Sequence, residues 1–260
     1  MAGKDDQPSN WYSKLASFNK YSGWYSASLA DFAPWIDKAH ANYPTRCIGV
    51  SEYGAGASII QHSEDPVAKP EPKGLFHPEE YQNLFHETYW QVMKQRPYLW
   101  CKFVWNMADF AIDNRHEGDT AGRNDKGLVT YGRQVRKDAF YWYKANWTTN
   151  PMVYITGHTF TNRLTNSITA KVYANCDSVE LYLNGTSQGV HTSTNCIFTW
   201  PVTLPGGTNT VKAVGKAGAM YEVKEIFIPE KKSKVEMLGG TPEEAAAALV
   251  EKLRKEAKVL

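Results

Sequence analysis

One glutamate of this sequence stands between a short apolar run and a glycine-rich segment. The run is Cys47 to Val50, the carboxylate is Glu52, and Gly54 and Gly56 follow it. Such a run is typical of a buried parallel strand, and glycines let the backbone turn sharply and come close to a ligand. The carboxyl ends of buried strands are where α/β barrels keep catalytic groups. The pattern indicates a catalytic glutamate about as well as it indicates a solvated glutamate ahead of a glycine loop.

Strands and helices are expected to alternate through residues 13–148. The strands are predicted at 15–19, from 47 and at 100–105, and the helices at 29–43, 78–96 and 133–147. Apolar residues at helical spacing predict the helices, and prolines end the first two. Two long loops, 61–77 and 108–126, follow the second and third strands. In a barrel, loops in this position form the active-site face, so we expect them there.

The pattern changes to a period of two after Asn150. Apolar residues alternate with polar ones along residues 168–172 and 179–183, and Asn184-Gly185 is a hairpin signal. Further strands are predicted near Trp200, at 211–214 and at 222–228. Short strands at such spacing are typical of a β-sandwich, here predicted over residues 149–229. Residues 1–12 are predicted as a polar leader, and residues 230–260 as a charged linker followed by an amphipathic helix.

Five segments in fixed order carry a resemblance to a known family. The segments are Phe18–Tyr25, Ser51–Gly56, Phe103–Phe110, Asn124–Val129 and Arg136–Tyr141. They resemble the catalytic barrel of glycoside hydrolase family 2, which contains β-galactosidases and β-glucuronidases. Residues 179–185 are similar to the immunoglobulin-like domain that follows the barrel in bacterial β-galactosidases. The resemblance implies an α/β plus all-β chain: the last three βα units of a (β/α)8 TIM barrel, an immunoglobulin-like β-sandwich and a C-terminal helix.

The resemblance also assigns roles to individual residues. Glu52 matches the nucleophile of a retaining hydrolase that cleaves terminal β-linked sugars through a glycosyl-enzyme intermediate, and Tyr21 matches a tyrosine that hydrogen-bonds it. Five residues match positions around the sugar: Trp105, Asn106, Asp109, Asn124 and Lys126. Asn124 and Lys126 match the Asn-x-Lys that glucuronidases use on the sugar carboxylate. The same segment is also similar to galactosidases, so β-galactosidase and β-glucuronidase both stay open.

The second carboxylate of such an enzyme has no match in this sequence. Retaining glycosidases need two carboxylates about 5 Å apart, and the family places its acid/base in an Asn-Glu pair on an earlier strand. This sequence contains no Asn-Glu pair. General acid/base help is worth roughly a factor of 100 to 10,000. The alternative hypothesis is therefore a non-catalytic carbohydrate-binding or assembly piece.

Composition excludes several other classes of function. The net charge of +2 gives no electrostatic footprint for nucleic acid, and no Cys/His cluster has zinc-ligand spacing. No cofactor or metal is expected, and no apolar run is long enough to span a membrane. Cys47 and Cys101 are predicted as buried free thiols, and free thiols are also favoured for Cys176 and Cys196. The N-terminal segment is too polar for a signal peptide, so localisation stays open.

A barrel segment with missing neighbours would have open edges. We expect the strand at 15–19 and the strand at 100–105 each to lack one neighbour, and inward-facing side chains such as Val50 and Trp105 to lack cover. Exposed strand edges invite pairing with other chains. The partners predicted are a carbohydrate and either a complementary barrel half or a second copy of the chain. The apolar stripe Leu249, Leu253 and Leu260 is a candidate cover for this surface.

Overall fold

The computed structural model describes residues 12–217 and residue 251, nearly all within the first of the chain's two units, Met1–Gly218. The predicted strand at 222–228 and all but one residue of the predicted C-terminal helix lie outside the described residues, as does most of the polar leader. In the first half of the chain, parallel strands alternate with helices. The elements are β1 (Leu15–Asn19), η2 (Leu29–Asp31), α1 (Phe32–Asn42), β2 (Cys47–Tyr53), α2 (Glu79–Lys94), β3 (Leu99–Val104) and α3 (Asp138–Trp147).

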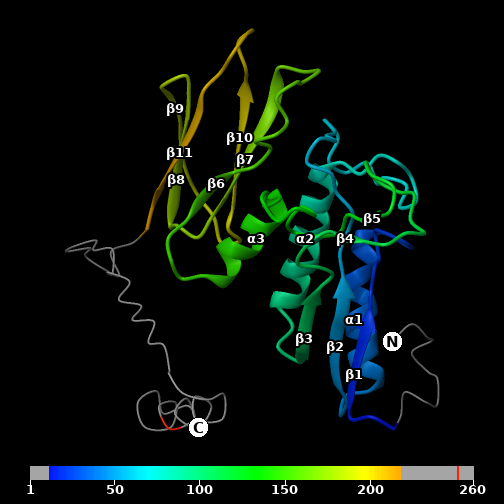
Figure 1. Ribbon diagram of the computed structural model, residues 1–260. Coiled ribbons are helices and arrows are strands. Elements are labelled where there is room, and N and C mark those ends of the chain that lie inside the picture. The colour runs from blue at the N-terminus through cyan, green and yellow to red at the C-terminus, as the bar shows by residue number, and fades with distance from the viewer. Residues whose placement is uncertain (1–11, 218–250, 252–260) are drawn as a thin grey trace. The chain divides into compact units, whose positions relative to one another are not determined.

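The three strands form one parallel sheet in the order β1-β2-β3, side by side in Figure 1. Leu15 pairs with Cys47, Phe18 with Val50 and Asn19 with Glu52, after an irregularity between Phe18 and Asn19. The predicted strands and helices are confirmed, but α3 begins five residues later than expected, at Asp138. The second long loop also contains a small antiparallel pair, β4 (Phe110–Ala111) and β5 (Arg123–Asn124).

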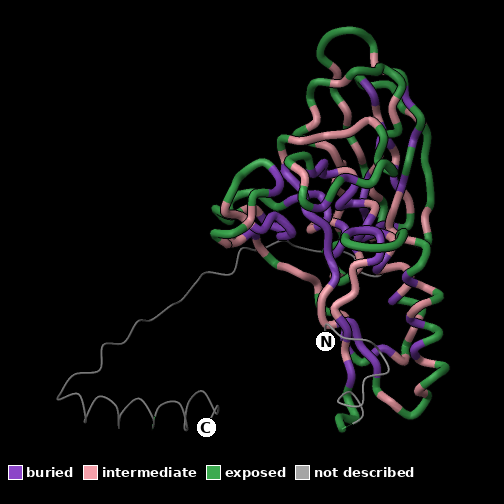
Figure 2. Tube along the Cα trace, turned by 90° about the vertical axis from the view of Figure 1, so that its right-hand side faces the viewer, coloured by how far each residue is buried: buried purple, intermediate pink, exposed green. Residues whose placement is uncertain are grey.

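Aromatic side chains dominate the core between the sheet and its helices. Phe32 of α1 stacks on Tyr89 of α2 at 3.9 Å between ring centroids, and Tyr89 stacks on Tyr53 of β2 at 5.4 Å. Val50 is fully buried in this same core. The expectation that Val50 lacks cover is therefore wrong, because its side chain lies on the face of β2 that the helices cover. The buried residues gather in the interior of the folded part of the chain, and the tips of the outer loops are exposed (Figure 2).

The cysteines follow the prediction at three of four positions. All four, which lie within the described part of the chain, are free thiols, and Cys101 and Cys176 are buried. Cys47 is exposed, so its predicted burial is wrong. It is the first residue of β2, opposite the exposed Leu15, and no part of the described chain covers that end of the sheet.

The second half of the described chain is a pair of antiparallel sheets that share one core. One sheet has the order β10-β7-β6 and the other β11-β8-β9. Their bounds are β6 (Val153–Ile155), β7 (Ser167–Ala174), β8 (Ser178–Leu183), β9 (Thr186–Thr192), β10 (Ile197–Thr203) and β11 (Val211–Lys216). The predicted hairpin joins β8 to β9, and Asn184 and Gly185 both have positive φ, as that turn requires. Val172 and Trp200 of one sheet pack with Leu181 of the other, which confirms the sandwich pattern.

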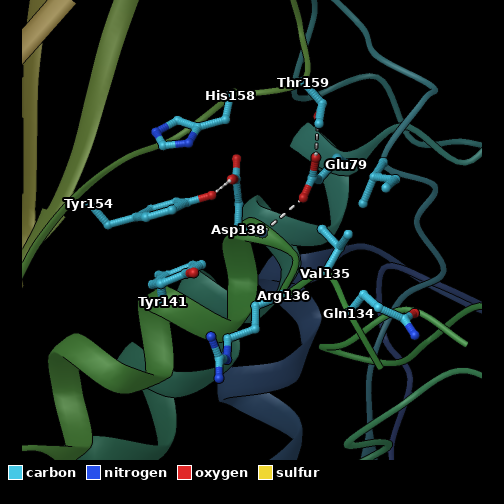
Figure 3. A pocket seen from close by; sticks show the side chains of 10 residues that line it. Glu79, Gln134, Val135, Arg136, Asp138, Tyr141, Tyr154, His158 and Thr159 are labelled. Carbon is cyan, nitrogen blue, oxygen red and sulfur yellow. Dashed lines mark hydrogen bonds between the residues drawn. The ribbon is translucent and has the colours of Figure 1, made fainter. Parts of the chain in front are cut away.

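A network of buried polar groups joins α2 and α3 to the start of the sandwich (Figure 3). Asp138 accepts hydrogen bonds from the Tyr154 hydroxyl at 2.7 Å and the Gly157 amide at 2.7 Å. The Asp138 amide donates to Glu79 at 2.8 Å, and Thr159 donates to the other oxygen of Glu79. These two carboxylates, which sequence reasoning did not identify, therefore tie the helices to the sandwich.

Both outer strands of the parallel sheet lack a second neighbour among the described residues, as expected. Exposed apolar side chains lie on these strands: Leu15 on β1, and Trp100 and Phe103 on β3. Within residues 12–217, no helix is long and apolar enough to cross a membrane.

Candidate functional site

Glu52 is the penultimate residue of β2, and a tyrosine from the segment after β1 holds its carboxylate. The Tyr21 hydroxyl donates a hydrogen bond to Glu52 Oε2 at 2.9 Å. The Lys20 amide donates to the Glu52 carbonyl at 2.8 Å, so the backbone fixes the two residues against each other. Burial raises the pKa of Tyr21, and the neighbouring Glu52 carboxylate raises it further. The phenol therefore stays protonated and serves as the donor to the Glu52 carboxylate.

Gly54 lets the chain after β2 pass close to the end of β3. A Cβ at Gly54 would lie 2.0 Å from the carbonyl oxygen of Trp105, so no other residue fits. The Trp105 amide donates to the Tyr53 carbonyl at 2.8 Å, which sets the tryptophan beside the end of β2. The Trp105 ring is partly exposed and meets Phe110 edge to face. The Trp105-Asn106 peptide bond is cis.

Lys126 is a buried cation with an incomplete set of partners. Its side chain is 1% exposed, and within the described part of the chain its ammonium group interacts with the Tyr25 hydroxyl but makes no close hydrogen bond to a carboxylate. The nearest carboxylate oxygen, on Glu117, is 3.8 Å away, and the ring centres of Tyr25 and Trp24 lie at 5.0 and 5.3 Å. Asn124 holds the backbone of this segment by accepting from the Lys126 amide at 3.1 Å. A buried ammonium in this state favours binding of an anionic group.

Three residues to which the sequence assigned no role lie between Lys126 and the Tyr21–Glu52 pair. They are Tyr25, Arg115 and Glu117. The Tyr25 ring packs against Tyr21 at 5.1 Å between centroids. Arg115 donates to the Tyr25 hydroxyl at 3.4 Å and to Glu117. Burial raises the pKa of Tyr25, but Lys126 and Arg115 outweigh burial and lower it overall. Arg115 and Glu117 lie in an aperiodic polar loop, so only their charges could have marked them in the sequence.

Asp109 and Asn106 are engaged with the protein itself. Asp109 is buried, and its Oδ1 accepts from Lys137 Nζ at 2.9 Å and from the Gly127 amide at 2.8 Å. Burial raises the pKa of Asp109, and the Lys137 ammonium opposes that rise. Asn106 donates to the Ala108 carbonyl at 2.7 Å. Asn106 Oδ1 is buried without a hydrogen-bond partner within the described residues, and contact of Asn106 and Asp109 with a sugar stays a prediction.

The described residues 12–217 contain no group of three or more His, Cys, Asp or Glu side chains arranged to hold a metal ion. The site brings together one carboxylate with a phenol donor, and a cationic cluster that a second tyrosine links to them.

Alternating strands and helices, a tyrosine-held carboxylate at a strand end and a following β-sandwich suit a glycoside hydrolase, and the relatives of this chain bear that out. It is 40% identical over 214 residues to a β-glucuronidase of Bacteroides fragilis, with 81% of this chain and 31% of that protein aligned. It is 30% identical over 235 residues to a putative β-glucuronidase of Formosa agariphila, covering 79% and 28%.

Solved structures agree with these relatives. An FMN-binding β-glucuronidase from Facaelibacterium prausnitzii L2-6 matches with a TM-score of 0.76 and 41% identity over 81% of this chain and 32% of that one. A putative β-galactosidase from Bacteroides fragilis matches with a TM-score of 0.77 and 33% identity over 82% and 32%. A family model described as a domain of unknown function (DUF4982) matches residues 166–221, a range that includes strands β7 to β11.

The homologues of this chain are thus β-glucuronidases and β-galactosidases of glycoside hydrolase family 2, and the chain fits the carboxyl-terminal region of these hydrolases. The resemblance inferred from the five segments is confirmed. The chain spans about a third of the length of the relatives named here.

Proposed function

We propose that this chain is the part of a retaining β-glycosidase that carries the nucleophile, Glu52. The observation that supports this most is the hydrogen bond from Tyr21 to Glu52 at the end of the middle strand. This hydrogen bond fixes the direction of the Glu52 carboxylate. The carboxylate is then ready to attack the anomeric carbon of a bound sugar.

The reaction proceeds in two displacements. A Glu52 oxygen forms a bond to the anomeric carbon while the bond to the leaving oxygen breaks, and an acid must protonate that oxygen. The same group, now a base, takes a proton from water, and the water oxygen displaces Glu52. We propose that this acid/base comes from the part of the barrel outside this chain, since the sequence contains no family-type Asn-Glu pair.

A covalent probe tests the nucleophile even if the chain does not turn over. A cyclophellitol-type aziridine should add its mass to Glu52 of the 260-residue chain, and Glu52→Gln should abolish this labelling. Glu71→Gln, which removes an exposed carboxylate, is the matched control. Labelling of Glu52→Gln at the rate of the unmodified chain would overturn the proposal. A folded chain that neither reacts with the probe nor hydrolyses nitrophenyl glycosides would instead support the non-catalytic alternative.

We further propose that the sugar is a uronic acid, so the enzyme is of β-glucuronidase rather than β-galactosidase type. The buried, incompletely partnered ammonium of Lys126 supports this, because a sugar carboxylate would complete its surroundings. Lys126→Met should weaken glucuronate binding about tenfold or more, which is the worth of one charged hydrogen bond. Galactose binding should change little. Titration of the chain with each sugar, followed by calorimetry or NMR, measures both. An unchanged glucuronate affinity would restore the β-galactosidase type.

The partner that we propose is a complementary barrel half. The open edges of β1 and β3 support it, together with the exposed Trp100 and Phe103. Unpaired backbone groups at the edge of a sheet bind further strands, so strands from the rest of a barrel could pair with β1 and β3. Parallel sheets are normally covered on both faces, and a complementary half would supply that cover as well.

A further inference from the structure

A second buried lysine lies behind the loop that carries Lys126, and its partners are complete. Lys137 is 1% exposed, and its ammonium group donates three hydrogen bonds. The acceptors are the Ala57 carbonyl at 2.7 Å, the Asp125 carbonyl at 2.8 Å and Asp109 Oδ1 at 2.9 Å. All three protons of the ammonium are therefore used, and Asp109 balances its charge.

The three acceptors come from three different segments. Ala57 follows the nucleophile strand β2, Asp109 follows β3, and Asp125 is the neighbour of Lys126. The Ala57 amide also donates directly to the Asp125 carbonyl at 3.1 Å. Lys137 thus sits where the nucleophile strand continues into its loop and where that loop meets the segment 124–126.

Other contacts confine Asp125 of the same segment. His77 bonds Asp125 Oδ2 at 2.6 Å. A Cβ on Gly56 would lie 2.5 Å from Asp125 Oδ1, and a Cβ on Gly118 would lie 2.6 Å from Asp125 Oδ2. The Asp125 side chain therefore has little room to move. Lys126 is the next residue, so the contacts that confine Asp125 also restrict the backbone of Lys126.

We propose that Lys137 is a positioning residue for sugar recognition, which sets the segment Asn124–Lys126 against the chain that leaves Glu52. This proposal rests on the proposed role of Lys126. Stability alone would not call for a buried ammonium, because well-packed apolar residues serve stability as well as a buried ion pair does. A lysine that donates hydrogen bonds to three loops fixes the positions of these loops relative to one another. Apolar packing fixes such positions less specifically.

Amide hydrogen exchange and sugar binding together test this role in the full chain. The two amides to follow are Lys126, which donates to Asn124 Oδ1, and Gly127, which donates to Asp109 Oδ1. In Lys137→Met, both amides should exchange at least about tenfold faster while the amides of α2 keep their rates, and glucuronate should bind about tenfold more weakly. Lys137→Arg keeps the positive charge and hydrogen-bond donors, so it should restore part of the amide protection and part of the glucuronate affinity. Lys144→Met, which alters an exposed lysine on α3, is the control.

The outcomes separate a positioning role from a stabilising one. If Lys137→Met is folded and both amides keep their rates, the proposal is overturned. If exchange rises equally throughout residues 12–217, Lys137 is only a stabiliser and the proposal is again overturned. If Lys137→Met does not fold, Asp109→Asn must still speed exchange at Lys126 and Gly127 selectively. A chain that does not bind glucuronate at all overturns the acidic-sugar proposal, while the exchange rates still decide the role of Lys137.

Discussion

Two tyrosines in one short segment differ in the direction of their pKa shifts because of the charges beside them. Tyr21 faces the carboxylate of Glu52, and burial and that charge raise its pKa. Tyr25 faces Arg115 and Lys126, and these cations lower its pKa against the effect of burial. The segment therefore presents a hydrogen-bond donor to Glu52 and a more acidic phenol to the cationic cluster.

Replacement of Tyr21 by phenylalanine should slow the reaction of Glu52 without unfolding the chain. The change removes one hydrogen bond to an ionised group, which is worth roughly 1.5–3 kcal/mol, or about ten- to a hundredfold in rate if it acts fully in the transition state. The rate of labelling by the aziridine measures this, and Tyr131→Phe, which alters an exposed hydroxyl, is the control. Labelling of Tyr21→Phe at the unmodified rate would remove Tyr21 from the machinery.

At the scale of elements, the amino-terminal ends of α2 and α3 bring two carboxylates together. Burial, and after it the negative charge of Asp138, raise the pKa of Glu79 to about 7. The Lys137 ammonium opposes this rise in the pKa of Glu79, and the Glu80 carboxylate adds to it. His158 and Tyr154 face Asp138. Protonation of Glu79 near neutral pH therefore affects the contact between the two helices and the sandwich.

Stability should depend on this proton with a definite sign. Glu79 holds its proton more tightly in the folded chain than in the unfolded chain, so folding loses stability as pH rises from about 4.5 to about 7. Glu79→Gln mimics the protonated form, and relative to it the unmodified chain should lose on the order of 3 kcal/mol between pH 4.5 and 8. Chemical unfolding at several pH values, with Glu71→Gln as control, measures the difference. A constant difference across this range would contradict the prediction.

At the scale of the whole molecule, the parallel sheet ends in two open edges within the described residues. β1 and β3 each pair only with β2, and Leu15, Trp100 and Phe103 are exposed on them. Neither edge is shielded by a further strand, and unpaired backbone groups on such strands bind other strands.

The isolated chain should therefore associate with itself or with a complementary barrel half. Sedimentation of the purified chain, with and without residues 235–260, measures the first of these. A monomer in both forms would contradict the argument from the edges. If both forms associate identically, the apolar stripe of Leu249, Leu253 and Leu260 has no part in covering the sheet.

The sequence by itself determined those features that depend on neighbouring residues. Apolar runs and helical spacing located three strands and three helices, Asn184-Gly185 located a hairpin, and five segments in fixed order identified the family. Such patterns arise from local backbone geometry and from the alternation of buried and exposed side chains. Each pattern therefore lies within one short segment of the sequence.

Only the tertiary structure decided which side chains meet across long separations. Arg115 contacts Tyr25 over 90 positions, and Lys137 contacts Ala57 over 80. Val50 and Cys47 were misjudged for the same reason, because apolar character does not say which face of a strand the helices cover or which end stays bare. The cationic cluster and the buried lysine behind it exist only where separate loops meet at the carboxyl ends of the strands, and no local pattern encodes such a meeting.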